Sequence, residues 1–324
     1  MKAVLCHQFG TPGDLAIADV PSPPLGAGQV RIAVRACGVN FPDVLMIQGL
    51  YQLKPPFPFS PGLEVAGDII EIAGDAQGVQ LGARVMATMM YGGFAEEVVV
   101  PAAGILPMPP EMSYEHGAGF SLAYGTSHVA LTHRGQLQSG ETLLVLGAAG
   151  GVGLTAVELG KRLGAQVIAA ASTREKLELA RAYGADELIN YKSENLRDRL
   201  NELTDGRGVD VIYDPVGGDL FDQAVRRLAW EGRYLVIGFA SGRIPSLPAN
   251  IALLKNASIV GTFWGAYLRN DPGVIHDSFA ILTDCYTAGL LKPHIHQVFA
   301  LDEAPSALRQ LMDRRAMGKV LLKT

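Results

Sequence analysis

The fold of this chain is decided by one stretch, Thr142-Leu143-Leu144-Val145-Leu146-Gly147-Ala148-Ala149-Gly150-Gly151-Val152-Gly153. Its first five residues form a continuous apolar run, which is typical of a parallel strand buried on both faces. After the glycines, apolar residues recur along one helical face from Val152 to Leu163. Glycines between such a strand and helix let the backbone approach a pyrophosphate at the helix N-terminus. The stretch therefore predicts the first strand, turn and helix of a dinucleotide-binding domain.

From this turn to about residue 263, the pattern alternates between strands and helices. Such alternation predicts a doubly wound α/β domain with a parallel sheet. The further predicted strands span residues 166–171, 188–190, 209–213, 233–237 and 259–263. The predicted helices span residues 174–183, 195–204 and 219–230.

The segments on either side of this domain have a different pattern. Residues 1–120 consist of short apolar stretches between glycine and proline turns, and Gln29–Val34 alternates polar and apolar side chains as a half-buried antiparallel strand does. The tail holds helical stretches at 274–288 and 304–315 and a strand at 318–322. We therefore predict an α/β-plus-β architecture. It comprises a mainly β domain (1–120), the dinucleotide-binding domain (121–262) and a C-terminal segment (263–324).

Composition excludes several classes of protein. The 324 residues carry a formal net charge of −5 without a run of Lys and Arg, so a main role in binding nucleic acid is not expected. The three cysteines form no CxxC pair, which fits a reducing compartment. The N-terminus has no signal-peptide pattern, and the longest nearly uncharged apolar stretch, 142–157, is short for a membrane span. The sequence therefore predicts a cytoplasmic protein that does not enter a membrane.

The residues after the second predicted strand indicate which dinucleotide is bound. NAD-binding domains usually place an Asp or Glu there to hold the ribose 2′-hydroxyl. This chain has Ser172 and Thr173, whose hydroxyls can donate to a 2′-phosphate, and Arg174 and Lys176, whose charges can neutralise it. The alternative is that the two basic residues only solubilise the first turn of a helix. We expect NADPH rather than NADH.

Three further motifs accompany the glycine-rich turn: Cys37-Gly38-Val39-Asn40-Phe41-Pro42-Asp43, Pro61-Gly62-Leu63-Glu64-Val65-Ala66-Gly67 and Gly92-Gly93-Phe94-Ala95-Glu96. Together they resemble the medium-chain dehydrogenase/reductase superfamily, and within it the zinc-free NADPH:quinone oxidoreductase (zeta-crystallin-like) branch. The resemblance covers nearly the whole chain. It implies a GroES-like catalytic domain, an inserted Rossmann domain for the cofactor and a C-terminal return to the catalytic domain.

The resemblance also bears on metal binding. Zinc members of the superfamily carry ligating Cys and His residues at the positions that Asn40 and Leu63 occupy here. An amide is a poor zinc ligand and leucine is none. The cysteine-rich lobe that holds a structural zinc in many relatives has no counterpart in this sequence. We therefore predict no zinc, which makes a zinc polyol dehydrogenase improbable.

Without a metal, direct alcohol oxidation is disfavoured, whereas hydride addition to an already electrophilic acceptor is not. Quinones and enones are such small-molecule acceptors, because the incoming charge delocalises onto a carbonyl oxygen that hydrogen-bond donors stabilise. The resemblance places Asn40 and Tyr51 at the substrate cleft, so we predict both as catalytic donors. The alternatives are a turn-stabilising amide and a packed aromatic ring. Leu45 stands where some quinone reductases have a cleft tyrosine, which predicts a more apolar pocket.

The resemblance further implies which residues contact the cofactor. Thr126 matches a threonine that meets the nicotinamide amide, and Tyr191 matches a residue near the adenosine phosphate. Segments after a late strand and toward the C-terminus match parts of the family that line the cofactor cleft. The predicted cofactor-binding residues are Thr126, Gly147, Ala149, Gly150, Gly151, Val152, Gly153, Ser172, Arg174, Lys176, Tyr191, Gly238, Phe239, Ala240, Phe263, Trp264 and Lys319.

Two other functions stay open at this point. The same cofactor geometry reduces an α,β-unsaturated thioester, so an enoyl- or acryloyl-CoA-type reductase is a rival within the enzymes. A non-catalytic NADPH-binding protein is a rival of another class. The family also implies a homodimer formed at the edge of the Rossmann sheet, near residues 259–263.

Overall fold

The computed structural model describes all 324 residues, which divide into two compact units. The first unit comprises Met1–Leu122 and Thr283–Thr324, and the second comprises Ala123–Leu282. The chain returns to the first unit at Thr283, twenty residues later than the predicted boundary. The reason is that the intervening segment packs on the second unit, where Ser278 Oγ lies 2.8 Å from His128 Nδ1.

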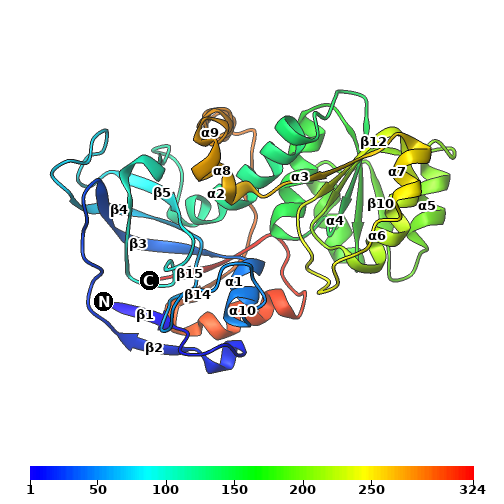
Figure 1. Cartoon of the computed structure of the whole chain (residues 1–324). Coiled ribbons are helices and arrows are strands. Elements are labelled where there is room, and N and C mark those ends of the chain that lie inside the picture. Colours follow the sequence, from blue (N-terminus) through cyan, green and yellow to red (C-terminus); the bar gives the residue numbers. More distant parts are fainter. The chain divides into compact units, whose positions relative to one another are not determined.

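The second unit is built on a parallel sheet of six strands (Figure 1). The strands are β8 (Thr142–Leu146), β9 (Gln166–Ala171), β10 (Glu187–Asn190), β11 (Val209–Asp214), β12 (Leu228–Val236) and β13 (Ser258–Gly261). Their order is β10-β9-β8-β11-β12-β13, and all five neighbouring pairs are parallel. This is the doubly wound order of a Rossmann domain, so the predicted fold is confirmed.

Helices cover both faces of this sheet. The helices that follow the strands are α3 (Gly151–Arg162), α4 (Arg174–Ala182), α5 (Leu196–Leu203), α6 (Gly218–Ala224) and α7 (Ala249–Lys255). Apolar residues of α5, α6 and α7 share one core with Leu144 and Ile168 of the sheet. On the opposite face, Gly160 of α3 approaches Leu143 so closely that an added Cβ would lie 2.4 Å from its side chain. Side chains that alternate along each strand thus pack against a layer of helices on either face of the sheet.

One predicted helix ends earlier than expected. The stretch 219–230 is helical only to Ala224, and after the short η4 (Val225–Arg227) strand β12 begins at Leu228. Leu228 pairs with Val209 of β11 and is fully buried, so strand pairing outweighs the helical pattern there. The remaining helices of this unit are the end of α2 (Tyr114–His128), the π-helical η3 (Val129–Arg134), α8 (Trp264–Asn270) and most of α9 (Pro272–Thr287).

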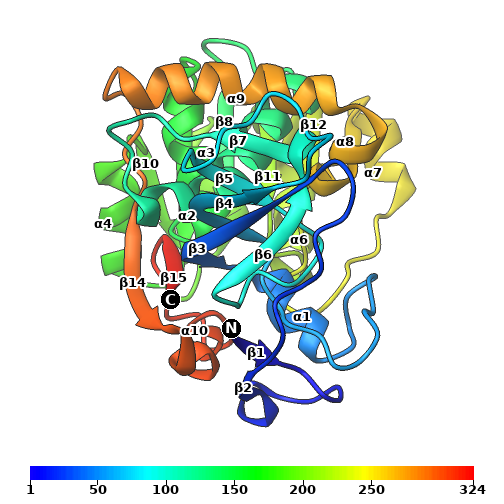
Figure 2. The ribbon, with the colours of Figure 1, turned by 90° about the vertical axis from the view of Figure 1, so that its left-hand side faces the viewer.

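The first unit contains a seven-stranded mixed sheet and a separate hairpin (Figure 2). The sheet comprises β3 (Gln29–Val39), β4 (Glu64–Ile72), β5 (Arg84–Thr88), β6 (Glu97–Pro101), β7 (Ile105–Pro107), β14 (Ile295–Ala300) and β15 (Lys319–Lys323). The other elements are β1 (Lys2–Leu5), β2 (Ala16–Asp19), α1 (Phe41–Ile47), α10 (Ala304–Met312) and the short η1 (Pro12–Asp14), η2 (Ala102–Gly104) and η5 (Leu301–Glu303).

The C-terminal strand completes this sheet. Strand β15 pairs antiparallel with the end of β3, where Val320 lies opposite Val39, and parallel with β14. Pairing between strands so distant in sequence brings Lys319 beside the end of β3 and the start of α1. No helix of the structure is both long and apolar enough to cross a membrane.

Candidate active site

The carboxyl edge of the parallel sheet gathers most of the predicted cofactor residues. All six strands run in the same direction, so the segments that follow them emerge at one edge. Strands β9 and β10 are added on one side of β8 and β11 to β13 on the other, so the strand order reverses at β8. Doubly wound sheets bind ligands in the crevice outside such a switch point.

The glycine-rich turn after β8 is shaped for close backbone approach. Gly147 has a φ of +61°, a conformation that favours glycine. A Cβ added to Gly153 would lie 2.2 Å from the carbonyl oxygen of Gly147, so no side chain fits there. The first N–H groups of α3 lack intrahelical acceptors, and the helix dipole favours an anion at this end. The turn can therefore hold a pyrophosphate.

The end of β9 presents the residues predicted for a 2′-phosphate. The Arg174 side chain is 92% exposed, and its nearest acid is Glu178 at 3.9 Å. Thr173 caps α4, because its hydroxyl accepts a hydrogen bond of 3.3 Å from the Lys176 N–H. The N–H of Tyr191, just beyond β10, donates to Ala171 O at 3.2 Å and so brings Tyr191 beside Ser172. Thr173 and Arg174 are exposed and Ser172, Lys176 and Tyr191 are partly exposed, so the group is open to a phosphate.

The ends of β11 and β12 are held together by backbone contacts. Gly238 N donates to Asp214 O at 3.3 Å, and Ala240 N donates to Pro215 O at 3.1 Å. The Asp214 carboxylate is buried and accepts hydrogen bonds from Tyr234 Oη, Val216 N and Gly217 N. Burial raises the pKa of Asp214, against the lowering effect of these hydrogen bonds. Asp214 therefore stabilises the turn that places Gly238, Phe239 and Ala240 at the sheet edge.

Two predicted cofactor residues follow β13. Phe263 is about half exposed, whereas Trp264 is buried. The indole of Trp264 covers Gly125 of α2, where an added Cβ would lie 2.9 Å from Nε1. The indole N–H has no hydrogen-bond partner in the structure. This contact places Trp264 beside Gly125, the neighbour of Thr126 in α2.

A buried hydroxyl network was not predicted from the sequence. Ser127 Oγ lies 2.8 Å from Thr155 Oγ1 and 2.9 Å from Tyr213 Oη, and it donates to Val152 O at 2.9 Å. These contacts connect α2, β11 and the first turn of α3. Isolated Ser, Thr and Tyr residues at such separations carry no sequence signal, so only the fold shows that they meet.

In the first unit, Asn40 begins α1 inside a buried polar cluster. Its Nδ2 donates to Glu64 Oε1 at 3.0 Å and to Gly38 O at 3.2 Å, and its Oδ1 accepts from Lys319 Nζ at 2.8 Å. Both amide hydrogens are therefore engaged within the unit. This geometry does not support Asn40 as the predicted donor to a substrate oxyanion.

Lys319 is also placed differently from the prediction. Its Nζ donates to Glu64 Oε1 at 2.6 Å, Asn40 Oδ1 at 2.8 Å and Val39 O at 3.4 Å, so its three hydrogens are directed into the first unit. Lys319 occupies the first position of β15, whose first four residues are all buried. The Lys319 ammonium is thus engaged within the first unit, and its predicted contact with the cofactor stays a prediction.

Of the two predicted catalytic residues, Tyr51 is the one whose side-chain donor, its hydroxyl, has no partner within the chain. Its ring is half-buried against the core of the first unit, and its hydroxyl makes no hydrogen bond within the chain. Burial raises the pKa of Tyr51, and the charge of Asp43 raises it further. Asp43 is fully buried, accepts hydrogen bonds from Asn40 N and Gly62 N, and has a pKa raised by burial to about 7. Tyr51 therefore remains a protonated donor at neutral pH.

The two positions that correspond to zinc ligands lie within this unit. Asn40 belongs to the buried cluster, and Leu63 packs in the apolar core. No group of three or more His, Cys, Asp or Glu side chains is arranged to hold a metal ion.

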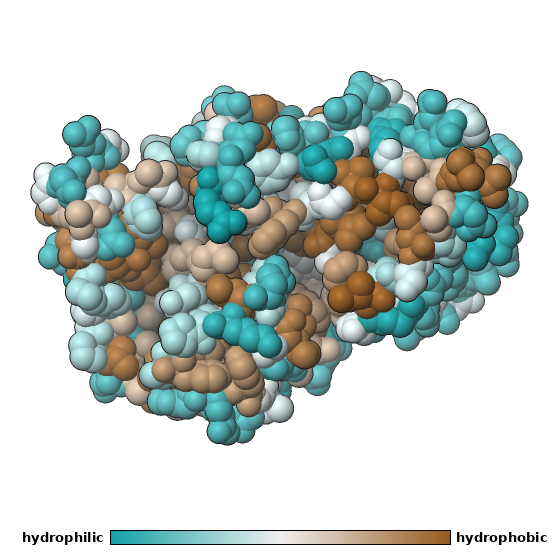
Figure 3. Space-filling model, in the orientation of Figure 1, coloured by the Kyte–Doolittle hydropathy of each residue, from teal (hydrophilic) through white to brown (hydrophobic).

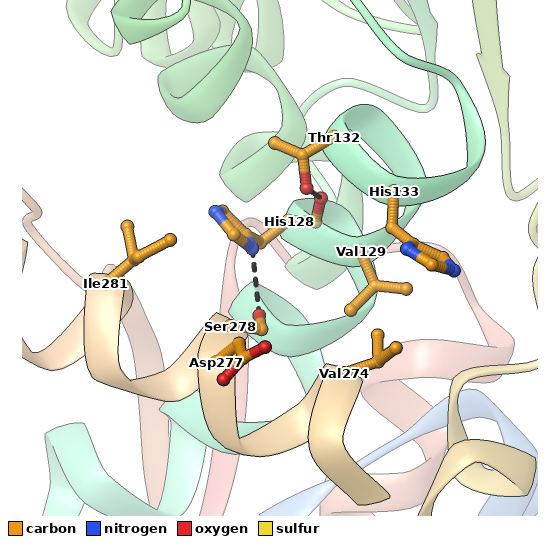
Figure 4. Close-up of a pocket in the computed structure, with 8 residues that line it drawn as sticks. All are labelled: His128, Val129, Thr132, His133, Val274, Asp277, Ser278 and Ile281. Carbon is orange, nitrogen blue, oxygen red and sulfur yellow. Dashed lines mark hydrogen bonds between the residues drawn. The ribbon is translucent and has the colours of Figure 1, made fainter. Parts of the chain in front are cut away.

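A pocket of about 320 Å³ lies elsewhere in the second unit, against the end of α2, η3 and α9 (Figure 4). His128 and Ser278 both line it and lie in hydrogen-bond contact, and burial lowers the pKa of His128, which keeps the imidazole neutral. None of the predicted cofactor or catalytic residues lines this pocket. We do not assign the reaction to it.

Comparison with known proteins identifies the family. The model of the alcohol dehydrogenase GroES-like domain matches residues 26–110, and the zinc-binding dehydrogenase model matches residues 151–278. The quinone oxidoreductase-like protein 2 homolog of Nematostella vectensis is 41% identical over 327 residues, covering 100% of this chain and 89% of the relative. The chain belongs to the quinone oxidoreductase-like family of medium-chain dehydrogenases/reductases. It is an oxidoreductase.

Solved structures agree with this family. The quinone oxidoreductase of Pseudomonas syringae has a TM-score of 0.94 at 31% identity, covering 100% of this chain and 99% of that one. The quinone oxidoreductase of Thermus thermophilus, which was also solved in complex with NADPH, has a TM-score of 0.86 at 34% identity, with 100% of both chains covered. The predicted superfamily, its GroES-like and Rossmann folds, and the oxidoreductase class are confirmed.

Proposed function

We propose that this oxidoreductase uses NADPH, works without zinc, and reduces quinones or other activated carbonyl acceptors such as enones. The observation that carries the proposal is the end of β9, where an acid is absent and Arg174 is 92% exposed beside Ser172. A ribose 2′-phosphate fits this group, whereas a free 2′-hydroxyl finds no carboxylate there. The NADPH complex of the Thermus thermophilus relative and the names of the family members support the same assignment.

The residues present fit such a dinucleotide. The Gly147–Gly153 turn leaves room that a side chain would fill, and the ion pair of Arg174 with Glu178 is long, at 3.9 Å. When bound, the cofactor supplies a hydride to the acceptor. In this proposal the Tyr51 hydroxyl donates a hydrogen bond to the acceptor oxygen as negative charge develops on it. The raised pKa of Tyr51 keeps the proton on that hydroxyl before the reaction.

NADPH oxidation with two panels of acceptors tests the proposal. We expect turnover with quinones and enones, and little or none with α,β-unsaturated acyl-CoA thioesters. Preference for the thioesters would favour the enoyl- or acryloyl-CoA-type reductase. Saturable NADPH binding with no turnover on either panel would favour a non-catalytic binding protein.

Replacing Tyr51 with phenylalanine removes the hydroxyl and keeps the ring. We expect kcat and kcat/KM for the acceptor to fall together by about 10- to 100-fold, because the lost bond belongs to the transition state. The affinity for NADPH should not change. Tyr91→Phe is the matched control, since Tyr91 is another partly exposed tyrosine of the first unit. If Tyr51→Phe reduced every acceptor at the wild-type rate, the hydroxyl would have no part in the reaction, and Tyr51 would contribute only the packing of its ring.

Zinc independence is tested by metal analysis and chelation. Asn40 and Leu63 cannot replace the Cys and His ligands of zinc relatives. We expect far less than one zinc per purified chain and unchanged turnover after dialysis against a strong chelator. About one zinc per chain, with activity lost on chelation and restored by zinc, would refute the proposal.

We further propose a homodimer that joins through β13, and action in the cytoplasm. Strand β13 lies at the sheet edge with a single neighbour, β12. Exposed apolar residues gather on the adjoining loop and helix α7, including Ile244, Leu253 and Leu254, and Figure 3 shows brown surface in this region. An open strand edge beside an exposed apolar patch suits pairing with a second copy. All three cysteines are free, which suits a reducing compartment.

A further inference from the structure

The first unit contains a buried ion pair that the proposed reaction leaves unexplained. Lys319 Nζ lies 2.6 Å from Glu64 Oε1, and the two side chains are 7% and 0% exposed. Removing two charges from water is costly, and their attraction offsets that cost only when further hydrogen bonds satisfy both groups. Replacing such a pair with apolar residues is often neutral or stabilising. Its presence here therefore calls for a reason other than stability.

Both charges are satisfied by partners from several elements. Besides Glu64, the Lys319 ammonium donates to Val39 O at the end of β3 and to Asn40 Oδ1. The Glu64 carboxylate also accepts from Asn40 Nδ2 at 3.0 Å and from Leu122 N of α2 at 2.9 Å. The pair thus connects β15, β3, β4, α2 and the start of α1.

The contacts also determine the orientation of the Asn40 amide. Its oxygen faces the ammonium and its nitrogen faces the carboxylate, so a reversed amide would oppose both partners. The Asn40 N–H in turn donates to the Asp43 carboxylate at 2.8 Å, which also accepts from Gly62 N at 3.0 Å. The ion pair therefore anchors the first turn of α1.

Helix α1 leads directly to Tyr51. The N–H groups of Leu50 and Tyr51 both donate to Leu45 O, at 2.9 and 3.2 Å, so Tyr51 is hydrogen-bonded back onto the helix. A shift of the α1 start is transmitted to Tyr51 through this short hydrogen-bonded segment.

We infer that Glu64 and Lys319 are positioning residues, whose ion pair holds Asn40 and α1 so that the Tyr51 hydroxyl lies in register with the acceptor oxygen. The part concerning the acceptor rests on the proposed function. Neither residue touches the reacting atoms in this assignment. They act through Asn40 and α1.

Hydrogen exchange measures the local part of this inference without any substrate. In Lys319→Met, the ammonium that holds Asn40 and the start of α1 is lost. We therefore expect the amides of residues 40–52 to exchange about 10-fold faster or more, which corresponds to about 1.4 kcal/mol in the free energy of local opening. Lys161→Met is the matched control, since Lys161 forms a 2.5 Å ion pair with Asp186 but is 48% exposed. It should leave the exchange of residues 40–52 unchanged. Unchanged exchange in Lys319→Met would overturn the inference.

A double-mutant cycle with Tyr51→Phe separates positioning from general support of the fold. If the ion pair places the Tyr51 hydroxyl, removing that hydroxyl should cost less than about twofold in kcat/KM in the Lys319→Met background. If the pair only supports the fold, Tyr51→Phe should keep its full cost in that background, which would overturn the positioning role. The conservative variant Lys319→Arg retains the charge and should preserve most of the effect of Tyr51→Phe.

If Lys319→Met does not fold, the double variant Glu64→Gln/Lys319→Met replaces it, because it leaves no buried charge unpaired. If the wild-type protein reduces no acceptor, the proposed function fails and the acceptor part of the inference fails with it. The exchange of residues 40–52 then decides alone whether the pair holds this segment.

Discussion

Gly153→Ala is expected to lower the affinity for NADPH by about 100-fold or more, which corresponds to ~2.7 kcal/mol. The added Cβ would lie 2.2 Å from the carbonyl oxygen of Gly147 and 2.9 Å from its carbonyl carbon. These are backbone atoms of a tight turn, so relief requires α3 or the turn itself to shift. Either movement displaces the N–H groups that would meet the pyrophosphate. A titration of NADPH fluorescence measures the loss, and the melting temperature should fall as well.

Gly150→Ala is the matched control in the same turn. Gly150 has a φ of −77°, and its added Cβ would lie 3.4 Å from Gly147 O, an ordinary contact. This variant should fold with a nearly unchanged melting temperature. Wild-type NADPH affinity in Gly153→Ala would show that the turn does not form the pyrophosphate site.

Arg174→Ala is expected to weaken NADPH binding by about 10- to 150-fold, since a hydrogen bond to a charged group contributes about 1.5–3 kcal/mol. The affinity for NADH should stay nearly constant, because NADH lacks the 2′-phosphate that Arg174 would meet. The structure supports this difference, since the guanidinium is 92% exposed and its nearest acid lies 3.9 Å away. Dissociation constants of both dinucleotides, measured on the same preparation, test the expectation.

Arg181→Ala provides the control on the same helix. Arg181 lies in the last turn of α4 and contacts the same Glu178, at 3.4 Å. It should leave both affinities unchanged. Equal losses of NADPH and NADH binding in Arg174→Ala would show that Arg174 supports α4 rather than a phosphate.

The predictions that held depend on local patterns. The strand, turn and helix at 142–162 follow from an apolar run, closely spaced glycines and helical periodicity, all of which act over a few residues. The same locality makes the group after β9 predictable, because Ser172 and Arg174 are placed by the strand that precedes them. The parallel sheet then brings the other strand ends to the same edge.

The predictions that failed depend on contacts between distant residues. Helical spacing extended the predicted helix to Trp230, but pairing with Val209 makes Leu228 the start of a strand. The chain rejoins the first unit at Thr283, whereas the predicted C-terminal segment begins at residue 263, since Trp264 and Ser278 pack on α2. Neither contact leaves a mark in the local sequence.

The sequence by itself determined the Rossmann domain and the residues that follow its strands, because backbone conformation and strand direction set both over short distances. Only the tertiary structure decided where Asn40 and Lys319 lie and which groups they contact. Glu64 and Lys319 are 255 residues apart in the chain, and strand pairing of β15 with β3 brings their charges together in the buried interior. There, desolvation forces each charge and amide to find a partner, so the Asn40 donors turn inward and Tyr51 is left as the free donor.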